Sequence, residues 1–415
     1  MERVEFVGDS PGARFGHTIT PIGKDKAILF GGAVGDTGNI HPHSGKYVIT
    51  GDTFLCDYNL KRWKKLEGHG MLPSNRAAHS ALAVDHFFFV FGGALGGGEL
   101  ADDGLYQLDF LTLSDKAYWT VKNCKGSSPG ARYGHVMAYL KPFIVIFGGN
   151  TGSEPVGDIW KIDVFGNCVW EKVTTPGDSP LPRVYHSASI CRTGTASGMM
   201  VIFGGRGGDG VPLNDTWGLR KHRDGRMDWM RAPYRNNSKP AERYQHLSLF
   251  VGTLLLIVGG RNNQVGESMP LDIYDTDSSD WYRVETIDRF RHICFLFQDH
   301  IFVHGGFSQE APNIPTDSII RIDLNKLFSN HHTLFKGLAF EQGKEIFTVN
   351  HGTSPKSRGT KDHQEERRML EESRRQAVTQ QVRRSERREP EVIRRNIQTN
   401  RSIRLCPEAV VANFN

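Results

Sequence analysis

The chain is poor in the features that mark secreted, membrane and metal-binding proteins. Its six cysteines are scattered over 415 residues without a C-x-x-C or another short metal spacing, which predicts reduced packing residues of an intracellular protein. Apolar runs such as Leu254–Val258 are far too short to cross a bilayer, and the polar N-terminus is unlike a signal peptide. By elimination we expect a soluble protein of the cytoplasm, with the nucleus left open, and no membrane insertion.

A motif for reading nucleic acid is absent as well. The formal net charge is +5, but residues 1–360 hold 38 Lys and Arg against 37 Asp and Glu, whereas residues 361–404 hold 13 against 8. The basic balance therefore lies in the C-terminal segment, and no recognition-helix, zinc-finger or RNP pattern accompanies it. We predict no nucleic-acid partner.

What the chain does contain is a sixfold repeat. Six apolar runs end in a glycine pair, at positions 31–32, 92–93, 148–149, 204–205, 259–260 and 305–306. Each pair follows an Arg-x-x-His, at Arg14/His17, Arg76/His79, Arg132/His135, Arg183/His186, Arg243/His246 and Arg289/His292. Five units close on a tryptophan: Trp63, Trp119, Trp170, Trp229 and Trp281. Because the apolar runs are too short for buried helices, these kelch-type marks predict four strands per unit and an all-β, six-bladed kelch β-propeller over residues 1–326.

The sixth unit lacks a closing tryptophan, and the N-terminus can supply its missing strand. Trp63, Trp119 and Trp170 each lie thirteen residues before the next unit's arginine, and Met1 lies thirteen residues before Arg14. We therefore predict that residues 3–7 form the outer strand of blade six. This strand would close the ring and remove the free sheet edges that invite aggregation.

Less regular structure is expected after the repeat. We predict an irregular connector over residues 327–360 and a charged linker or tail over residues 361–415, partly helical or disordered. Residues 364–389 contain no glycine and one charged pair, Glu371 and Arg375, has helical spacing, but apolar side chains are too sparse to dock a helix firmly. A docking helix or a basic localisation patch is the alternative.

The repeated polar residues fall into two groups, histidines with an expected structural role and arginines with an expected binding role. A catalytic group is needed once, so histidines recurring at one blade position predict a structural role, satisfying buried backbone groups between blades. The arginines can point to the channel mouth, because positions one and four of Arg-x-x-His face opposite sides of a strand. Together with two arginines that follow glycine pairs, they predict a cationic binding site for an acidic or phosphorylated protein segment. Its residues are Arg14, Arg76, Arg132, Arg183, Arg243, Arg289, Arg206 and Arg261. The alternative is that these arginines pair with local carbonyls or carboxylates.

Two further possibilities concern other parts of the propeller. Residues 221–226 (KHRDGR) predict a tight Asp-Gly hairpin between the third and fourth strands of blade four, which is either a solvated turn or a docking surface on the opposite face. An enzyme site inside the channel would need convergent acid–base or metal groups. None stands out from the sixfold pattern.

Several runs together resemble the N-terminal kelch domain of the Ser/Thr protein phosphatases with kelch-like repeats (PPKL). These runs are residues 219–229 (LRKHRDGRMDW), 243–246 (RYQH), 76–79 (RAAH) and 132–137 (RYGHVM). The resemblance covers about residues 10–325. It implies a regulatory region that recruits substrates or partners in phosphorylation signalling and that contacts its own phosphatase domain.

The same family carries a metal-dependent phosphatase domain after the propeller. The motifs G-D-x-H-G, G-D-x-V-D-R-G and G-N-H-E, which supply the ligands of its two-metal (Mn, Fe or Zn) site, are absent here. We therefore expect no enzyme activity and no cofactor in this chain, and a two-metal site only in a missing phosphatase domain. The alternative is a free-standing kelch scaffold or adaptor with no attached enzyme.

Overall fold

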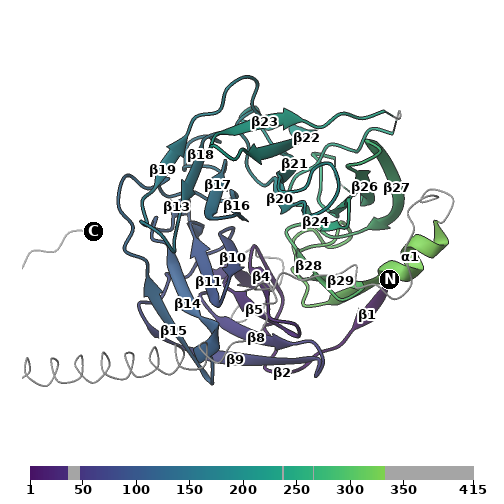
Figure 1. Ribbon diagram of the computed structural model, residues 1–415. Coiled ribbons are helices and arrows are strands. Elements are labelled where there is room, and N and C mark those ends of the chain that lie inside the picture. The colour runs from purple at the N-terminus through teal and green to yellow at the C-terminus, as the bar shows by residue number, and fades with distance from the viewer. Residues whose placement is uncertain (36–46, 236–237, 265, 332–415) are drawn as a thin grey trace, which may run out of the picture. The chain divides into compact units, whose positions relative to one another are not determined.

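The computed structural model describes residues 1–35, 47–235, 238–264 and 266–331. In this part of the chain, six antiparallel four-stranded blades surround a central axis (Figure 1). The predicted all-β propeller is thereby confirmed. No helix in the described residues has the length and apolar character needed to cross a membrane.

Each blade runs from its innermost strand outward. Blade one comprises β4 (Thr18–Ile22), β5 (Lys26–Phe30), β8 (Thr53–Asp57) and β9 (Arg62–Gly70), and blade two comprises β10 (Ser80–Val84), β11 (Phe87–Phe91), β14 (Tyr106–Asp109) and β15 (Lys116–Val121). Blade three comprises β16 (Val136–Leu140), β17 (Phe143–Phe147), β18 (Ile159–Ile162) and β19 (Glu171–Val173), and blade four comprises β20 (Ser187–Ile190), β21 (Met200–Arg206), β22 (Pro212–Lys221) and β23 (Met227–Arg231). Blade five comprises β24 (Leu247–Val251), β25 (Leu254–Val258), β26 (Met269–Asp275) and β27 (Asp280–Ile287), and blade six comprises β28 (Ile293–Phe297), β29 (His300–His304), β30 (Ile319–Asp323) and β1 (Glu2–Val4).

Further short strands lie outside the four-stranded blades. They are β2 (Val7–Gly8), β3 (Arg14–Phe15), β6 (Ala33–Gly35), β7 (Tyr47–Ile49), β12 (Ala94–Gly96) and β13 (Glu99–Leu100), and a 3-10 turn, η1, spans Phe110–Thr112. Strands β3, β6 and β7 form one small sheet, and β12 and β13 form another. Strands β6 and β7 lie in the connection between the second and third strands of blade one, as β12 and β13 do in blade two, and β3 comes just before the first strand of blade one.

The core consists of one apolar cluster at each interface between neighbouring blades. The second strands lie in the middle of these clusters, and Phe88 to Phe91 of β11 are fully buried, as expected for a strand packed on both faces. The tryptophans fill the gaps between blades as predicted: the ring pairs are Phe30–Trp119 (5.0 Å), Phe91–Trp170 (5.6 Å), Phe147–Trp229 (4.9 Å) and Phe203–Trp281 (5.5 Å). The inner strands contact one another all the way round, including β28 with β4.

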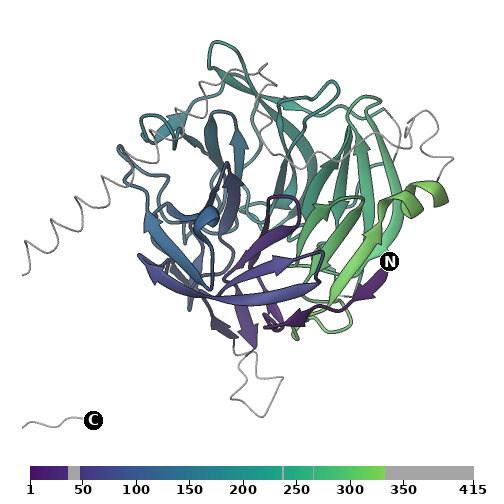
Figure 2. The ribbon, with the colours of Figure 1, turned by 60° about the horizontal axis from the view of Figure 1, so that its bottom comes forward.

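The N-terminal strand closes blade six, as the spacing of the repeats predicts. Strand β1 pairs antiparallel with β30, with Val4 opposite Ile319, and Figure 2 shows this purple strand alongside the light-green one. Its bounds differ from the prediction, because the pairing with β30 covers only residues 2–4. Residues 7 and 8 (β2) pair instead in parallel with β9 of blade one. One segment thus joins the two ends of the ring.

Between these two pairings, Phe6 packs into the interface of blades six and one. Its ring centroid lies 5.9 Å from that of Trp63 and 6.4 Å from that of Phe302. Phe6 therefore fills apolar space at the point where the chain passes from blade six to blade one.

A short helix follows the last strand. Helix α1 spans Leu324–Asn330, and Asp323 caps it by accepting a hydrogen bond from the Lys326 N–H (2.9 Å). Leu327 and Phe328 are buried in the cluster between blades five and six. The predicted boundary at residue 326 falls inside this helix, so residues 327–330 are helical and not part of an irregular connector. The predictions for residues 332–415 lie outside the described residues.

The glycine pairs mark the closest approach of neighbouring blades. The N–H of the second glycine donates to the carbonyl of the next blade's repeated arginine, as from Gly93 to Arg132 (2.8 Å), and this bond recurs six times around the ring. A Cβ on Gly92 would lie 2.6 Å from Cε1 of His135 and closer still to the carbonyl oxygen of Arg132. The first glycine of the pair is therefore required for space as well as for its φ of +65°.

Candidate functional site

The repeated arginines do not line an open mouth. Five of them are at most 2% exposed, namely Arg14, Arg76, Arg132, Arg183 and Arg243, and Arg289 is half-buried. The prediction that these six side chains form a cationic ring for a ligand is contradicted, and the alternative that they pair locally describes them. Strand alternation predicts that each arginine and its histidine point to opposite sides of the strand. It does not predict that the guanidinium turns into the blade.

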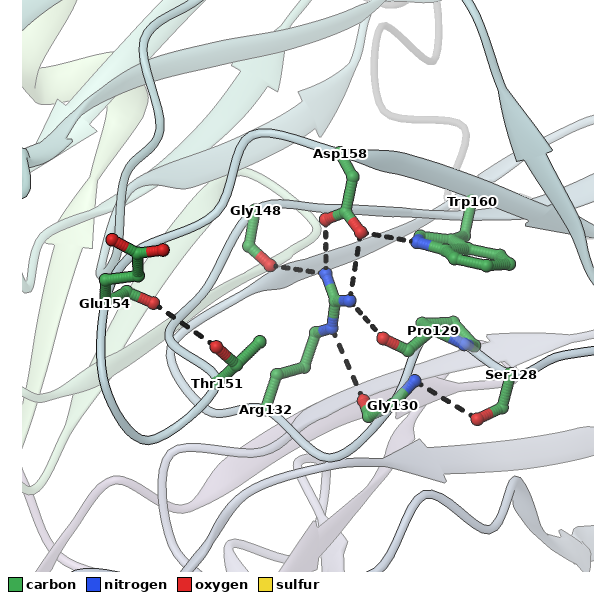
Figure 3. Close-up of polar contacts among 9 residues, drawn as sticks. All are labelled: Ser128, Pro129, Gly130, Arg132, Gly148, Thr151, Glu154, Asp158 and Trp160. Carbon is green, nitrogen blue, oxygen red and sulfur yellow. Dashed lines mark hydrogen bonds and ion pairs between the residues drawn. The ribbon is translucent and has the colours of Figure 1, made fainter.

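Arg132 illustrates what the repeated arginine does (Figure 3). Its Nη1 donates to the carbonyl oxygen of Gly148 (3.0 Å) and to Oδ1 of Asp158 (2.7 Å), and its Nη2 donates to Oδ2 of Asp158 (3.2 Å). Trp160 donates to the same carboxylate through Nε1 (2.7 Å). Burial opposes ionisation of Asp158, but the hydrogen bonds from Arg132 and Trp160 outweigh it and lower the pKa of the carboxyl. The guanidinium is therefore already neutralised by a carboxylate.

The same arrangement recurs around the ring. The repeated arginines of blades one, two, four and five also donate to the carbonyl of their own blade's first glycine. Their carboxylate partners are Asp52, Asp102, Asp215 and Asp272. In blade six a hydroxyl replaces the carboxylate, because Arg289 donates through Nη2 to Oγ of Ser318 (2.6 Å). Sequence analysis missed these acids, although an acidic residue recurs at or just before the third strand of five blades.

The repeated histidines pack between blades more than they form hydrogen bonds. His246 donates through Nε2 to the carbonyl of Phe203 (3.1 Å), as predicted, but both ring nitrogens of His135 and His186 lack a partner among the described residues. Four of the six share a steric contact: the rings of His79, His135, His186 and His246 pack against Phe30, Phe91, Phe147 and Phe203 of the preceding blades. Burial lowers the pKa of His79 and His292 to about 3, so these side chains are neutral.

The residue before each repeated histidine forms the rim of the central channel. These six rim residues are Gly16, Ala78, Gly134, Tyr185, Gln245 and Arg291, and their φ angles lie between 53° and 63°. Each rim N–H donates to the carbonyl of the rim residue in the preceding blade at 2.7–3.3 Å, and Gly16 closes the circle on Arg291. A ring of six backbone hydrogen bonds therefore joins all the blades at the rim. The sequence carries no signal for it, since the six residue types differ.

The rim has two unlike halves. Blades one to three contribute Gly16, Ala78 and Gly134, whereas blades four to six contribute Tyr185, Gln245 and Arg291. Inside the rim lies a channel of about 380 Å³, which falls within the usual range of about 300–1,000 Å³ for ligand pockets. Small and apolar side chains predominate in its wall, among them Ala81, Val136, Ala188, Leu247 and Ile293.

Arg291 is held in place at the rim by three neighbours. With its amide oxygen turned toward blade six, Gln245 accepts hydrogen bonds from Nε (2.7 Å) and Nη2 (3.1 Å) of Arg291. The guanidinium carbon lies 5.3 Å from the ring centroid of Phe15 and 6.0 Å from that of Tyr185. Sequence analysis did not single out Arg291, because it occupies one of the two variable positions of Arg-x-x-His.

Two predicted arginines lie next to this rim. Arg206 and Arg261 follow the glycine pairs of blades four and five, and their guanidinium carbons lie 5.6 and 5.5 Å from the ring centroid of Tyr244. Arg206 is exposed and Arg261 is half-buried. We call Arg206, Arg261 and Arg291 the open arginines, because none of them forms an ion pair with a carboxylate in the part of the chain that the structure describes.

Comparison with known proteins accounts for the repeat. Residues 105–306 match the family model of the KLHDC2/KLHL20/DRC7 Kelch-repeats domain. The chain belongs to the kelch-repeat family. Kelch domains generally mediate protein–protein interaction, and this kelch domain is a module of that class.

The relatives of this kelch domain include a phosphatase. "Serine/threonine-protein phosphatase BSL2" of Arabidopsis thaliana is 31% identical over 68% of this chain and 30% of its own length. This similarity confirms the resemblance to the kelch region of the PPKL phosphatases. "Host cell factor 2" of Homo sapiens is 25% identical, covering 62% of this chain and 40% of that protein. The chain thus spans about a third of the length of the curated relatives it matches.

The predicted hairpin of blade four is also present in this kelch domain. It connects β22 and β23, with Gly225 at a φ of +88° and its N–H donating to the carbonyl of His222 (3.1 Å). Two of its exposed charges are paired within the turn, because Arg226 donates through Nε to Asp224 (2.6 Å), whereas the exposed Arg223 forms no ion pair with a carboxylate of the described residues.

Proposed function

We propose that this chain is the partner-recruiting kelch region of a Ser/Thr protein phosphatase. Support comes from the similarity to the plant phosphatase, which covers the kelch repeats and only 30% of that protein. Because the phosphatase motifs are absent here, catalysis and the two-metal site would belong to a domain outside the sequence in hand. The domain would act in the cytoplasm or nucleus, and it would also contact its own phosphatase domain.

Within that role, the rim and the open arginines would bind an acidic or phosphorylated segment of the partner. One contrast carries this proposal: the five buried arginines each have a carboxylate partner, whereas the open arginines have none among the described residues. Guanidinium groups form strong, directional hydrogen bonds to carboxylates and phosphates, so an anionic segment is the chemically matched occupant.

Charge reversal at the mouth tests the binding proposal. The variant carries Arg206→Glu and Arg261→Glu, and the matched control carries Arg226→Glu in the blade-four hairpin, where the side chain is 71% exposed. Binding is measured on an array of synthetic peptides that differ only in carrying Glu, phosphoserine, phosphotyrosine or Gln at one position. We expect the double variant to lose the anionic peptides and the control to keep them. Binding of wild-type protein should weaken as salt rises through about 0.15 M, where the screening length is about 8 Å.

Other outcomes would contradict this proposal. If the double variant keeps its anionic ligands and the control loses them, the interaction surface lies at the hairpin. If the wild type does not distinguish Glu or phosphate from Gln, the mouth does not select anions.

A free-standing scaffold is the second candidate, favoured by the similarity to host cell factors, whose names denote no enzyme. Sequencing the transcript beyond the codon for Asn415 separates the two. A downstream G-D-x-H-G motif supports the phosphatase, and an in-frame stop without it supports the scaffold.

A further inference from the structure

We propose that the outer edge of blade four is a docking site for an extended segment of a partner protein. The segment adds to β23 as a parallel strand and places a large apolar side chain against Trp217 and Trp229. Strand β23 lies on the outside of the ring (Figure 1), and the pocket beside it shares no lining residue with the channel. This surface is therefore separate from the mouth and independent of the binding function proposed above.

The first step is a backbone hydrogen bond that recurs between neighbouring blades. The chain leaving one blade donates to a carbonyl two residues before the tryptophan of the next blade. These bonds run from Val7 to Lys61 (2.8 Å), from Lys125 to Cys168 (2.8 Å) and from Arg235 to Ser279 (2.9 Å). Between blades one and two, the contact extends to a parallel pairing of β9 with β15. The chain thus covers the outer edges of blades one, two, three and five with its own backbone.

The second step is the residue at which blade three should form this bond. In blades two and four the donor lies six residues after the tryptophan of its own blade, as Lys125 does after Trp119. Six residues after Trp170 the chain carries Pro176, and proline has no N–H to donate. Among the described residues, no backbone hydrogen bond joins residues 174–182 to β23. The sequence therefore leaves the edge of blade four open.

The third step is what this open edge presents. The N–H of Ala232 donates to the carbonyl of Thr216 (2.9 Å), so the even-numbered residues of β23 face β22. The backbone groups of Met227, Trp229 and Arg231 therefore point away from β22, and they have no backbone partner in the part of the chain that the structure describes. Such a row of N–H and C=O groups is a template for an added strand.

The fourth step is a pocket of about 490 Å³ beside this edge. Its lining residues are Asp178, Ser179, Trp217, Trp229 and Arg231. Trp217 is held in the wall, because its Nε1 donates to Oδ2 of Asp215 (2.8 Å). An apolar side chain that leaves water gains free energy against the two indole rings. Blade one shows the arrangement: Phe6 directly precedes the donor Val7 and packs on Trp63, with 5.9 Å between the ring centroids. An added strand places its apolar side chain on Trp229 in the same way.

The test begins with phage-displayed random dodecapeptides selected on the full chain carrying Arg206→Glu and Arg261→Glu, which removes the positive charge of these two side chains at the mouth. We expect enrichment of Phe, Leu or Met flanked by residues of high strand propensity. One selected peptide is then synthesised with each backbone N–H methylated in turn, and its affinity for the wild-type protein is measured. Methylation of every second residue should weaken binding about tenfold and methylation of the intervening residues should not, because only alternate N–H groups of a strand face its neighbour.

Two variants at Arg231 separate the backbone of β23 from its side chains. Arg231→Pro removes an outward N–H but no hydrogen bond to β22, and proline is tolerated on an edge strand, so the fold should survive. Arg231→Gln keeps the N–H and is the matched control. We expect Arg231→Pro to weaken binding about tenfold and Arg231→Gln to bind like the wild type. If Arg231→Pro does not fold, hydrogen exchange of the wild type serves, since the β23 amides should become protected when the peptide binds.

A third variant, Pro176→Lys, gives blade three the residue that blade two carries at the bridging position. The chain can then cover the edge of blade four itself, so peptide binding should weaken. An unchanged affinity would contradict the role assigned to the proline.

Other results would overturn the proposal as a whole. If Arg231→Pro binds like Arg231→Gln and the effects of methylation do not alternate, the peptide does not bind as a strand. If no peptide is enriched, a partner segment is the wrong occupant. Protection of the β23 amides in the free chain would then assign the edge to another segment of this chain, and a dimer that Arg231→Pro dissociates would assign it to a second copy. None of these results affects the proposed binding of anionic segments at the mouth.

Discussion

Adding one methyl group at a blade interface should show whether glycine is required there for its positive φ or for lack of space. Gly92 and Gly97 both have positive φ, at +65° and +60°, so alanine meets a similar backbone penalty at each. They differ in space. A Cβ at Gly92 would lie 2.6 Å from Cε1 of His135, whereas a Cβ at Gly97 would have no heavy atom within 4 Å. Gly92→Ala tests packing between blades, and Gly97→Ala is the matched control.

The expected difference follows from what surrounds Gly92. The obstructing Arg132 carbonyl cannot retreat freely, because it accepts the Gly93 N–H (2.8 Å). The shared left-handed conformation costs about 1–2 kcal/mol in both variants. Overpacking adds about 1–3 kcal/mol at Gly92 alone. We therefore expect Gly92→Ala to be less stable than Gly97→Ala by about 2 kcal/mol, the middle of that range.

Urea unfolding followed by tryptophan fluorescence measures this difference, with the buried rings at the blade interfaces as probes. Thermal unfolding gives a second value, because about 1 kcal/mol shifts Tm by at least about 2 °C in a domain of this size class. Equal free energies of unfolding for the two variants would refute the reasoning. The glycine pair would then be required for its φ and not for space.

Three further predictions concern closure, buried charge and acid. Deleting residues 1–8 removes β1, the buried side chain of Val4 and the half-buried ring of Phe6. Full burial of such a side chain is worth roughly 1.5–3 kcal/mol, so cooperative unfolding should be lost, and an unchanged Tm would contradict the closure. Asp158→Ala should lower the free energy of urea unfolding by about 3 kcal/mol, because it leaves Arg132 buried without its carboxylate. Asp224→Ala on the surface should change it by no more than about 0.5 kcal/mol. Equal costs would show that the buried pair is not structural. Burial lowers the histidine pKa values, so the unfolded chain binds more protons than the folded chain below about pH 6.5. The free energy of unfolding should therefore fall from there toward pH 3, by up to about 1.4 kcal/mol per pH unit for each buried histidine. A free energy of unfolding that stays constant between pH 7 and 5 would contradict this. These histidines are His17, His79, His135, His186, His246, His292 and His304.

The candidate site was only partly predictable, and the repeated arginine shows why. Arg132 recurs at a position that strand alternation turns away from the core, which favours exposure. Its carboxylate partner, Asp158, lies 26 residues further along the chain and approaches only after the blade has formed. Sequence spacing identified the repeated cation, but not the acid that neutralises it.

The rim was not predictable at all. Ala78 and Arg291 share neither size nor charge, yet they occupy the same position in the ring of backbone hydrogen bonds. A sequence pattern reports positions where one side chain is required, and here the backbone conformation is required instead.

By itself, the sequence determined the number of blades, their order and the closure of the ring. Those features depend on local requirements that repeat: an apolar run short enough for a strand, a glycine pair where blades meet, and a tryptophan that fills the gap. Only the tertiary structure decided which charges remain available to a partner. Whether an arginine such as Arg132 is buried, or one such as Arg206 is open, depends on carbonyls and carboxylates that the ring brings together from distant parts of the chain.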